Sequence, residues 1–361
     1  PTVPSVLDIG TQPSLVHACV QTRSAGMAPA RSSRPAGRIS SMTTSKAGAE
    51  AKILSWGAVV RDLVVPSREG PQRVVLGLNS LEDYIAHSPH YGALAGRFAN
   101  RIRNGRFTLD GETYQLDQNF LGKHGLHGGS AGFGKRPWQV AHNDENSVTL
   151  TLFSHDGDGG FPGNLTVTCR YSFVEPANLR TEITATTDKA TIVNLALHSY
   201  YNLDGSADIL DHIVQIPADF ISTLDAELIP TGEIRSVTGT PFDFRTPRAV
   251  RFAGEGGDFF KYDQNFMLST RGGPLRHAAT VTSPKNGLSM EVHTTEPCIQ
   301  FYDGVKMKPL VPGLGGVMYG ARAGLCLEPQ NVPDSPIVSH FPSPVLRPGE
   351  VYRQVTDYRF K

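Results

Sequence analysis

Two residues of types that suit proton transfer lie far apart in the chain, and each belongs to an apolar, strand-like run. His198 ends the run VNLALH at residues 193–198, and Glu328 follows the run GLCL at residues 324–327. A carboxylate and an imidazole are the side chains best suited to remove and donate a proton near neutral pH. The pattern therefore indicates a reaction that needs one base and one acid and no redox step. The competing interpretation is structural: a glutamate in an ion pair and a histidine packed in the core.

Short blocks around these two residues recur, in the same order, in a known protein family. The blocks are residues 96–102 (GRFANRI), 125–129 (GLHGG), 198–203 (HSYYNL), 262–266 (YDQNF), 300–302 (QFY) and 324–335 (GLCLEPQNVPDS). On these blocks the chain resembles the aldose 1-epimerases, also called galactose mutarotases, from about residue 51 to the C-terminus. Six blocks in the family's order identify a family far more specifically than any single block does.

The resemblance implies both an activity and a set of site residues. It implies that Glu328 is the base that takes the proton of the anomeric hydroxyl, and that His198 is the acid that protonates the ring oxygen as the C1–O5 bond breaks. The open aldehyde then turns about C1–C2 and recloses on its other face. The substrate-binding residues that the resemblance implies are Asn100, Arg101, His127, Asp263 and Gln300.

Neighbouring residues of similar chemistry suggest weaker alternatives. His124 and His127 form a His-x-x-His pair, but no third ligand accompanies them, so we expect neither a metal nor a cofactor. Arg97 and Arg103 are as basic as Arg101 but are expected to pair with surface carboxylates.

The chain departs from the family pattern at four positions next to the named residues. Ala196 and Leu197 precede His198 where the family often has Thr and Asn, Gln264 stands where it often has His, and Pro329 stands where it often has Thr. None of these departures removes a proton-transfer group. They put substrate preference and rate in doubt rather than the class of reaction.

Composition narrows the class of partner. The chain has 361 residues, with 34 Lys plus Arg and 34 Asp plus Glu, so its formal net charge is zero. A chain without net charge has no long-range field that would recruit nucleic acid or an anionic membrane. The expected partner is a small, neutral sugar, and the chain is expected to act as a monomer or a homodimer.

The cysteines and the apolar runs bear on the compartment. Cys19, Cys169, Cys298 and Cys326 are widely spaced, which favours reduced and mostly buried thiols over metal ligands or a disulfide framework. No apolar run reaches the length that spans a bilayer, and no convincing secretory signal precedes the rest of the chain. We therefore expect a cytoplasmic protein.

From about residue 51 onward the local pattern is that of strands. Alternating, β-branched runs occur at residues 53–65, 147–153, 165–173, 179–186 and 279–282. Asn-Gly and Asp-Gly pairs, such as those at residues 110–111 and 286–287, are typical of hairpin turns. The pattern predicts an all-β fold, and the resemblance implies a large, twisted antiparallel β-sandwich of the galactose mutarotase type with few short helices.

The first 46 residues differ from the rest. They are rich in Ser, Thr, Ala and Pro and contain Asp8 as their only acid, which favours disorder. We expect residues 1–46 to be a dispensable tail, or sequence upstream of a start at Met27 or Met42, and residues 47–361 to form one catalytic domain. A targeting peptide is a weaker alternative.

Taken together, the residues favour an aldose 1-epimerase that acts on free hexoses such as galactose or glucose. One rival is a hexose-phosphate epimerase of the same superfamily, which would need a cluster of Arg or Lys for the phosphate. The other is a carbohydrate-binding sandwich that has lost catalysis. Such a protein would retain Arg101 and Asp263 but lose Glu328 or His198, and both are present.

Overall fold

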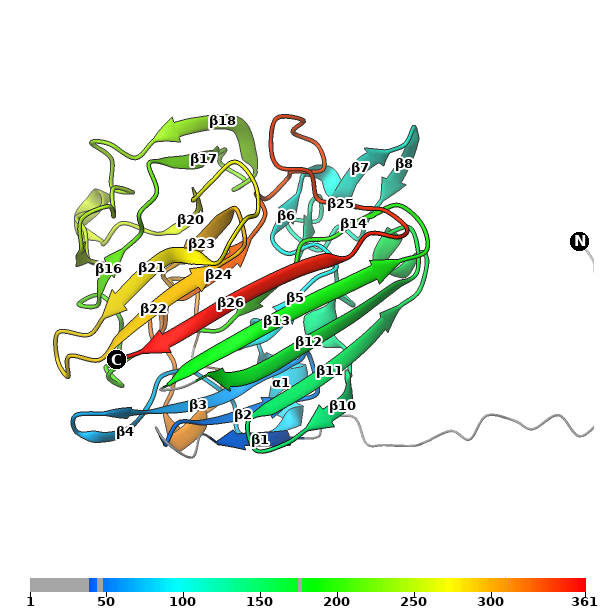
Figure 1. The fold of residues 1–361 in the computed structure, drawn as a ribbon. Helices are drawn as coiled ribbons and strands as arrows, with labels where there is room; N and C mark the ends of the chain where they lie inside the picture. Colours follow the sequence, from blue (N-terminus) through cyan, green and yellow to red (C-terminus); the bar gives the residue numbers. More distant parts are fainter. Residues whose placement is uncertain (1–38, 44–47, 175–176, 309) are drawn as a thin grey trace, which may run out of the picture. The chain divides into compact units, whose positions relative to one another are not determined.

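A computed structural model of the chain describes residues 39–43, 48–174, 177–308 and 310–361, and most of its regular structure is antiparallel β-sheet (Figure 1). All of these residues belong to one compact unit, Ala36–Lys361. The expected all-β sandwich fold is confirmed. None of the described helices has the length and apolar character required to cross a membrane.

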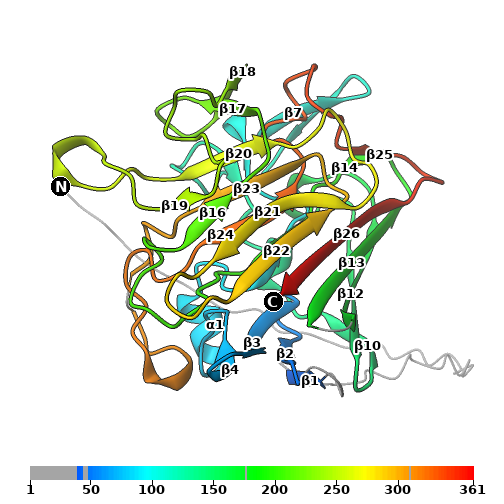
Figure 2. The same cartoon turned by 60° about the vertical axis from the view of Figure 1, so that its left-hand side comes forward.

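A nine-stranded sheet forms one layer of the sandwich. Its strands alternate between buried and solvent-facing positions: in β12, for example, Leu165, Val167, Cys169 and Tyr171 are buried and Arg170 is exposed. The order is β10 (Gln139–Asn143), β11 (Ser147–Ser154), β12 (Leu165–Val174), β13 (Asn178–Thr187), β26 (Tyr352–Phe360), β22 (Ser289–Thr294), β21 (Arg276–Thr282), β16 (Ile213–Gln215) and β19 (Arg248–Ala249). Figure 2 shows β12, β13, β26 and β22 running side by side.

A five-stranded sheet packs against this layer and carries much of the site. Its order is β18 (Pro230–Ser236), β17 (Phe220–Leu224), β20 (Asp263–Met267), β23 (Cys298–Tyr302) and β24 (Cys326–Gln330). Phe266, Ile299, Phe301 and Leu327 join the same hydrophobic core as Leu150 and Val167 of the large sheet. One face of β20, β23 and β24 is thus committed to the core, which leaves the alternate residues for the other face.

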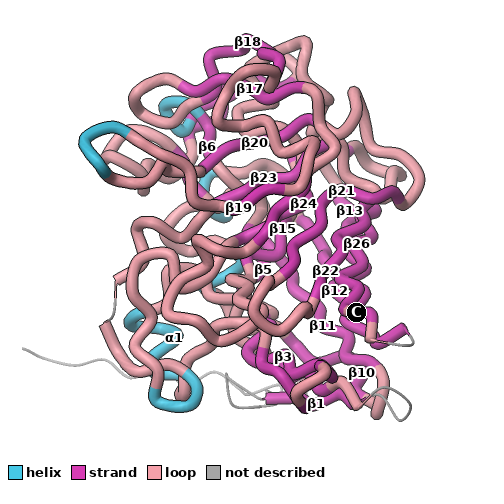
Figure 3. The backbone as a smooth tube through the Cα atoms, turned by 90° about the vertical axis from the view of Figure 1, so that its left-hand side faces the viewer, coloured by secondary structure: helices cyan, strands magenta, loops and turns pink. Residues whose placement is uncertain are grey.

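Smaller sheets and turns complete the unit. β5 (Ala93–Ala95) pairs with β15 (Ala196–His198), β6 (Arg101–Ile102) with β9 (Gly125–Leu126), β7 (Arg106–Leu109) with β8 (Glu112–Gln115), and β14 (Thr191–Ile192) with β25 (Val345–Leu346). The helical segments are α1 (Leu81–His87) and the short turns η1 (Arg103–Gly105), η2 (Phe133–Lys135), η3 (Asp158–Gly160), η4 (Glu255–Gly257) and η5 (Leu314–Gly316). In Figure 3 they lie among loops, away from the long strands of the nine-stranded sheet.

A four-stranded sheet contains the first described strands: β1 (Ile39–Thr43), β2 (Glu50–Leu54), β3 (Val59–Ser67) and β4 (Gly70–Arg73). β1 lies within the segment expected to be a tail and pairs with β2 from Ile39↔Leu54 to Thr43↔Glu50. Residues 1–38 and 44–46 of that segment lie outside the described residues, as does residue 47.

Turn geometry refines two predictions. The run at residues 53–65 is not one strand, because Gly57 and Ala58 have positive φ and turn the chain from β2 into β3. Asp110 and Gly111 also have positive φ and close the β7–β8 hairpin, as their sequence predicts.

Candidate active site

Strand register gathers a row of polar side chains on the face of the five-stranded sheet opposite the core. Gln300 of β23 is paired with Glu328 of β24 on one side and with Asn265 of β20 on the other. Asp263 of β20 is paired with Tyr302. Paired residues of adjacent strands project to the same face, so Glu328, Gln300 and Asp263 lie close together despite their distance in sequence.

His198, the last residue of β15, meets Glu328 at the end of this row. The His198 Nε2 atom lies 3.7 Å from Glu328 Oε1, and both side chains are almost fully buried. On the other side of the ring, His198 Nδ1 lies 3.5 Å from the sulfur of Cys326. The two residues best suited to proton transfer are therefore in reach of one another and of a common ligand.

Asp263 is held by two of the residues that the sequence singled out. Arg101 Nη2 donates to Asp263 Oδ2 at 2.9 Å, and Gln300 Nε2 donates to Asp263 Oδ1 at 2.7 Å. The Arg101 guanidinium also lies 4.9 Å from the centre of the Phe120 ring. Gln300, which the resemblance implied to be a substrate-binding residue, is paired with Glu328 across the sheet and orients Asp263 through its side-chain amide.

Asn100 and His127 are fixed by each other. The Asn100 backbone N–H donates to His127 Nδ1 at 3.1 Å, while Asn100 Oδ1 accepts from the Arg101 backbone N–H at 2.9 Å. With Nδ1 occupied as an acceptor, neutral His127 carries its proton on Nε2. Gly128 makes this loop possible, because a Cβ there would lie 1.9 Å from the Gly96 carbonyl oxygen.

These side chains line a cleft with a volume of about 180 Å³. Of the residues implied by the resemblance, Asn100, Arg101, His127, His198, Asp263 and Glu328 line it, whereas Gln300 lies just behind. The cleft also contains residues to which the sequence analysis gave no role: Pro89, His90, Phe120, Leu126, Tyr200, Tyr302 and Lys306. Leu126, Tyr200 and Tyr302 lie inside the quoted blocks, so the blocks themselves could have indicated them. His90, whose ring centre is 4.7 Å from that of His127, lies outside every block.

Burial shifts the protonation equilibria of the cleft toward neutral forms. Burial, together with the nearby Asp263, raises the pKa of Glu328 well above its ordinary value, while Arg101 opposes the shift. Burial lowers the pKa of His198 to about 4 and that of His90 to about 3. The pKa of His127 is lowered well below its ordinary value by burial and by the neighbouring His90 and His198. The site therefore resists holding a net charge on any of these groups.

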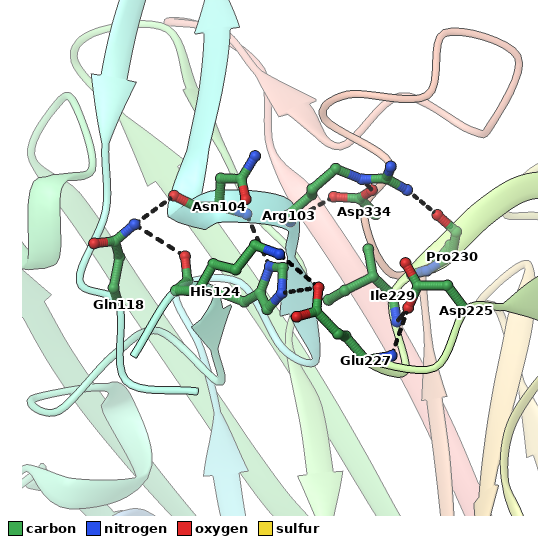
Figure 4. Close-up of polar contacts among 10 residues, drawn as sticks. Arg103, Asn104, Gln118, His124, Asp225, Glu227, Ile229, Pro230 and Asp334 are labelled. Carbon is green, nitrogen blue, oxygen red and sulfur yellow. Dashed lines mark hydrogen bonds and ion pairs between the residues drawn. The ribbon is translucent and has the colours of Figure 1, made fainter. Parts of the chain in front are cut away.

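A polar network braces the strand that carries Arg101 (Figure 4). Asp334 accepts from the Arg103 backbone N–H at 2.7 Å and donates its own N–H to the Arg101 carbonyl at 2.9 Å. His124 accepts from the Asn104 N–H at 3.0 Å and contacts Glu227 through Nε2 at 3.2 Å. Both ring nitrogens of His124 are thus used in the brace, so His124 and His127 serve separate networks.

The expectation for Arg97 is wrong, and that for Arg103 is only half right. Arg97 is 1% exposed and donates to the carbonyls of Pro162 and Gly163 at 2.7 and 2.9 Å, and to Ser154 Oγ at 2.8 Å. The local sequence could not reveal that backbone carbonyls, rather than a carboxylate, would surround Arg97, because those carbonyls belong to a distant segment of the chain. Arg103 does pair with a carboxylate, but its partner Asp334 is fully buried.

None of the four departures from the family pattern lines the cleft. Gln264 donates to the Ser222 carbonyl, and the Pro329 carbonyl accepts from Gln354 at 2.9 Å. Ala196 packs in a small apolar cluster with Ala95 and Ala99, and Leu197 packs in the main core. These residues support the strands that present Asp263, Glu328 and His198, and they contribute no atom to the lining of the cleft.

Comparison with known proteins places this geometry in context. The family model described as aldose 1-epimerase matches residues 40–359. The chain is 38% identical over 322 residues to an aldose 1-epimerase of Escherichia coli K12, covering 87% of this chain and 92% of the relative, and 40% identical over 314 residues to a galactose mutarotase of Homo sapiens, covering 85% and 90%. A solved structure described as an aldose epimerase homologue from C. elegans superposes with a TM-score of 0.85 at 31% identity, covering 90% of this chain and 99% of that one.

Proposed function

The chain belongs to the aldose 1-epimerase family, and from that membership we propose that Glu328 and His198 carry out the family's reaction, the interconversion of α and β anomers of an aldose. The observation that carries the proposal is the 3.7 Å separation of Glu328 Oε1 and His198 Nε2 in a cleft lined by polar side chains. Both oxygens involved in anomerisation, O1 and O5, are bonded to C1. A base and an acid this close together can reach both.

Ring opening requires two proton transfers. Glu328 takes the proton of the O1 hydroxyl, the C1–O5 bond breaks, and His198 delivers a proton to O5. The C1–C2 bond then rotates, and reclosure returns the two protons by the reverse route. The α and β anomers differ only in which face of the aldehyde O5 attacks.

The electrostatics of the cleft favour this direction of proton movement. Before ring opening the pair is a carboxylate and an imidazolium, and afterwards it is a neutral carboxylic acid and a neutral imidazole. Burial raises the pKa of Glu328 and lowers that of His198, so the low-polarity surroundings favour the neutral pair. The same shifts disfavour the carboxylate and imidazolium with which the reaction starts, so the surroundings stabilise the pair after proton transfer relative to the pair before it.

The remaining polar groups are suited to binding sugar hydroxyls. Asp263 offers acceptors whose orientation is fixed by Arg101 and Gln300. Asn100 and His127, which also line the cleft, offer donors. Glu328 Oε2 is buried and has no partner among the described residues, which supports its use by a bound ligand.

We propose free hexoses, with galactose and glucose as the first candidates, as the substrates. The cations among the residues lining the cleft are Arg101 and Lys306, and Arg101 is already paired with Asp263. That arrangement gives little support to a phosphate dianion, which would call for several unpaired cations. The unpaired, buried thiols of Cys169, Cys298 and Cys326 support a cytoplasmic location.

Polarimetry of freshly dissolved α-galactose and α-glucose tests the proposal. The rotation should relax to its equilibrium value faster in proportion to the amount of protein added. A relaxation equal to that of buffer alone for both sugars would leave a binding protein as the better interpretation. Acceleration only for a 6-phosphorylated hexose would instead favour the hexose-phosphate epimerase.

A further inference from the structure

The described residues bring together one group of three side chains that can ligate a metal: His198, Cys326 and Glu328. One ligand atom from each lies within 4.8 Å of the others. The exposed fractions are 6%, 0% and 2%, respectively. Imidazole, thiolate and carboxylate together are a ligand set typical of zinc.

The spacing of two of these ligands already suits a tetrahedral zinc ion. With Zn–S and Zn–N bonds of about 2.3 and 2.0 Å, a tetrahedral angle separates the sulfur and nitrogen by about 3.5 Å. The measured separation of Cys326 Sγ and His198 Nδ1 is 3.5 Å. Glu328 Oε1 lies 3.7 Å from the other ring nitrogen, Nε2, so the carboxylate must move toward the Nδ1 side of the ring to supply the third bond.

The third ligand and the route of entry are also available. Glu328 Oε2 is buried and has no partner among the described residues, so a cation would displace no existing protein contact from it. His198 and Glu328 line the cleft, whereas Cys326 contacts the inner, Nδ1 side of the imidazole. A cation entering from the cleft must therefore pass to the Nδ1 edge of the ring to bind the thiol, with its fourth position left for a water from the cleft.

We propose that His198, Cys326 and Glu328 form an inhibitory site for a thiophilic divalent cation of the zinc class. Binding requires the deprotonated thiol and carboxylate, so the thiol proton and any proton on Glu328 are released to solvent as the metal–ligand bonds form. The bound cation occupies both proton-transfer groups and excludes the sugar. The inhibition rests on the function proposed above, whereas the binding itself does not.

Binding is measured on the purified full chain with Co²⁺ and Zn²⁺ as the probes. Co²⁺ added to metal-free protein should produce the near-ultraviolet thiolate-to-cobalt charge-transfer band and the intense visible bands of a tetrahedral site, at one ion per chain, and Zn²⁺ should abolish them. Cys326→Ser should remove the charge-transfer band and weaken Zn²⁺ binding at least tenfold. Cys298→Ser is the matched control, because Cys298 is also fully buried and lies one strand away without contacting His198.

Inhibition is measured separately, as the Zn²⁺ concentration that halves the anomerisation rate of each variant relative to its own metal-free rate. It should rise at least tenfold in Cys326→Ser and stay unchanged in Cys298→Ser. Cys326→Ala, checked by thermal melting, replaces the serine variant if the latter does not fold. A Co²⁺ spectrum without a thiolate band, or Zn²⁺ affinity that is equal in wild type and Cys326→Ser, would overturn the site. A protein that binds Co²⁺ as expected but accelerates no anomerisation would refute the proposed function alone.

Discussion

At the scale of single residues, two buried glutamates with raised pKa values differ in whether they can reach a ligand. Burial raises the pKa of both Glu328 and Glu296, the latter to about 8. Glu328 lies in the cleft within 3.7 Å of a histidine and close to Asp263 and Arg101. Glu296 lies in the connection between β22 and β23 and does not line the cleft. Only Glu328 is in a position to exchange a proton with a ligand.

The comparison leads to a matched pair of substitutions. Glu328→Gln retains the side-chain volume but removes the base, and we expect kcat to fall by about 10²–10⁴ with the fold intact. Glu296→Gln removes another buried carboxyl, outside the cleft, and we expect kcat to remain near that of wild type. Polarimetry and circular dichroism of both variants check the prediction. The base assignment fails if Glu328→Gln retains more than about a third of wild-type kcat.

Substitutions at His198 and Arg101 should have different effects on kcat and KM. His198→Asn removes the acid that acts as the C–O bond breaks, so kcat should fall more than KM rises. Arg101→Ala leaves Asp263 without its ion pair and loosens the grip on the sugar, so KM should rise as well. Initial rates over a range of galactose concentrations distinguish the two. A change confined to KM in His198→Asn would make His198 a binding group and transfer the acid role to His127.

At the scale of elements, the sheets meet through short connections whose buried groups respond to pH. The segment that joins β22 of the large sheet to β23 of the five-stranded sheet carries Glu296, whose backbone N–H donates to Thr294 Oγ1 at 3.1 Å. Because burial is the main cause of its raised pKa, the native state favours the protonated carboxyl. Ionisation of Glu296 in this connection therefore lowers the stability of the folded state.

This connection should make stability depend on pH with a definite sign. The pKa of Glu296 is about 8 in the folded state and near 4.5 in the unfolded state, so the native chain binds the extra proton between these values. The stabilising effect is fully present below about pH 4.5 and is lost as pH rises toward 8, by at most about 1.4 kcal/mol per pH unit. Melting temperatures of wild type and Glu296→Gln should therefore diverge in favour of the variant from about pH 5 to pH 8. Parallel curves would contradict the assignment of this carboxyl.

At the scale of the whole molecule, the N-terminal region raises the question of where the catalytic unit begins. β1 forms the edge of the four-stranded sheet and is paired with β2 over the whole of Ile39–Thr43. The family match begins at residue 40, within this strand. Neither observation assigns a role to the residues before Ile39.

Two truncations locate the start of the unit. A chain that begins at Ile39 should retain the anomerisation activity and the melting temperature of the full chain. A chain that begins at Gly48 lacks β1, exposes the backbone edge of β2, and should be less stable by roughly 2 kcal/mol or more, or about 3 °C or more in melting temperature for a chain of this size. Thermal melts and polarimetry of both truncated chains check this. Equal melting temperatures for the two would place β1 outside the fold, as the 1–46 boundary predicts.

The local sequence determined the features that depend on near neighbours. Side-chain alternation predicted the strands at residues 147–153, 165–173 and 179–186, which are β11, β12 and β13. The Asp110-Gly111 pair predicted its hairpin, because positive φ is a property of those residue types. The ordered blocks identified the family, and the assignment of Glu328 and His198 as the reactive pair stays a prediction.

Only the tertiary structure decided how distant residues meet. Register across β20, β23 and β24 brings Asp263, Gln300 and Glu328 onto one face, and the pairing of β15 with β5 adds His198. Register and sheet packing depend on contacts far apart in sequence, so no local pattern revealed that His90 enters the cleft, that Arg97 is buried among carbonyls, or that Gln264 points away from the site. The residue types set which chemistry is possible, and long-range packing set which side chains share the cleft, because burial and proximity are properties of the folded chain.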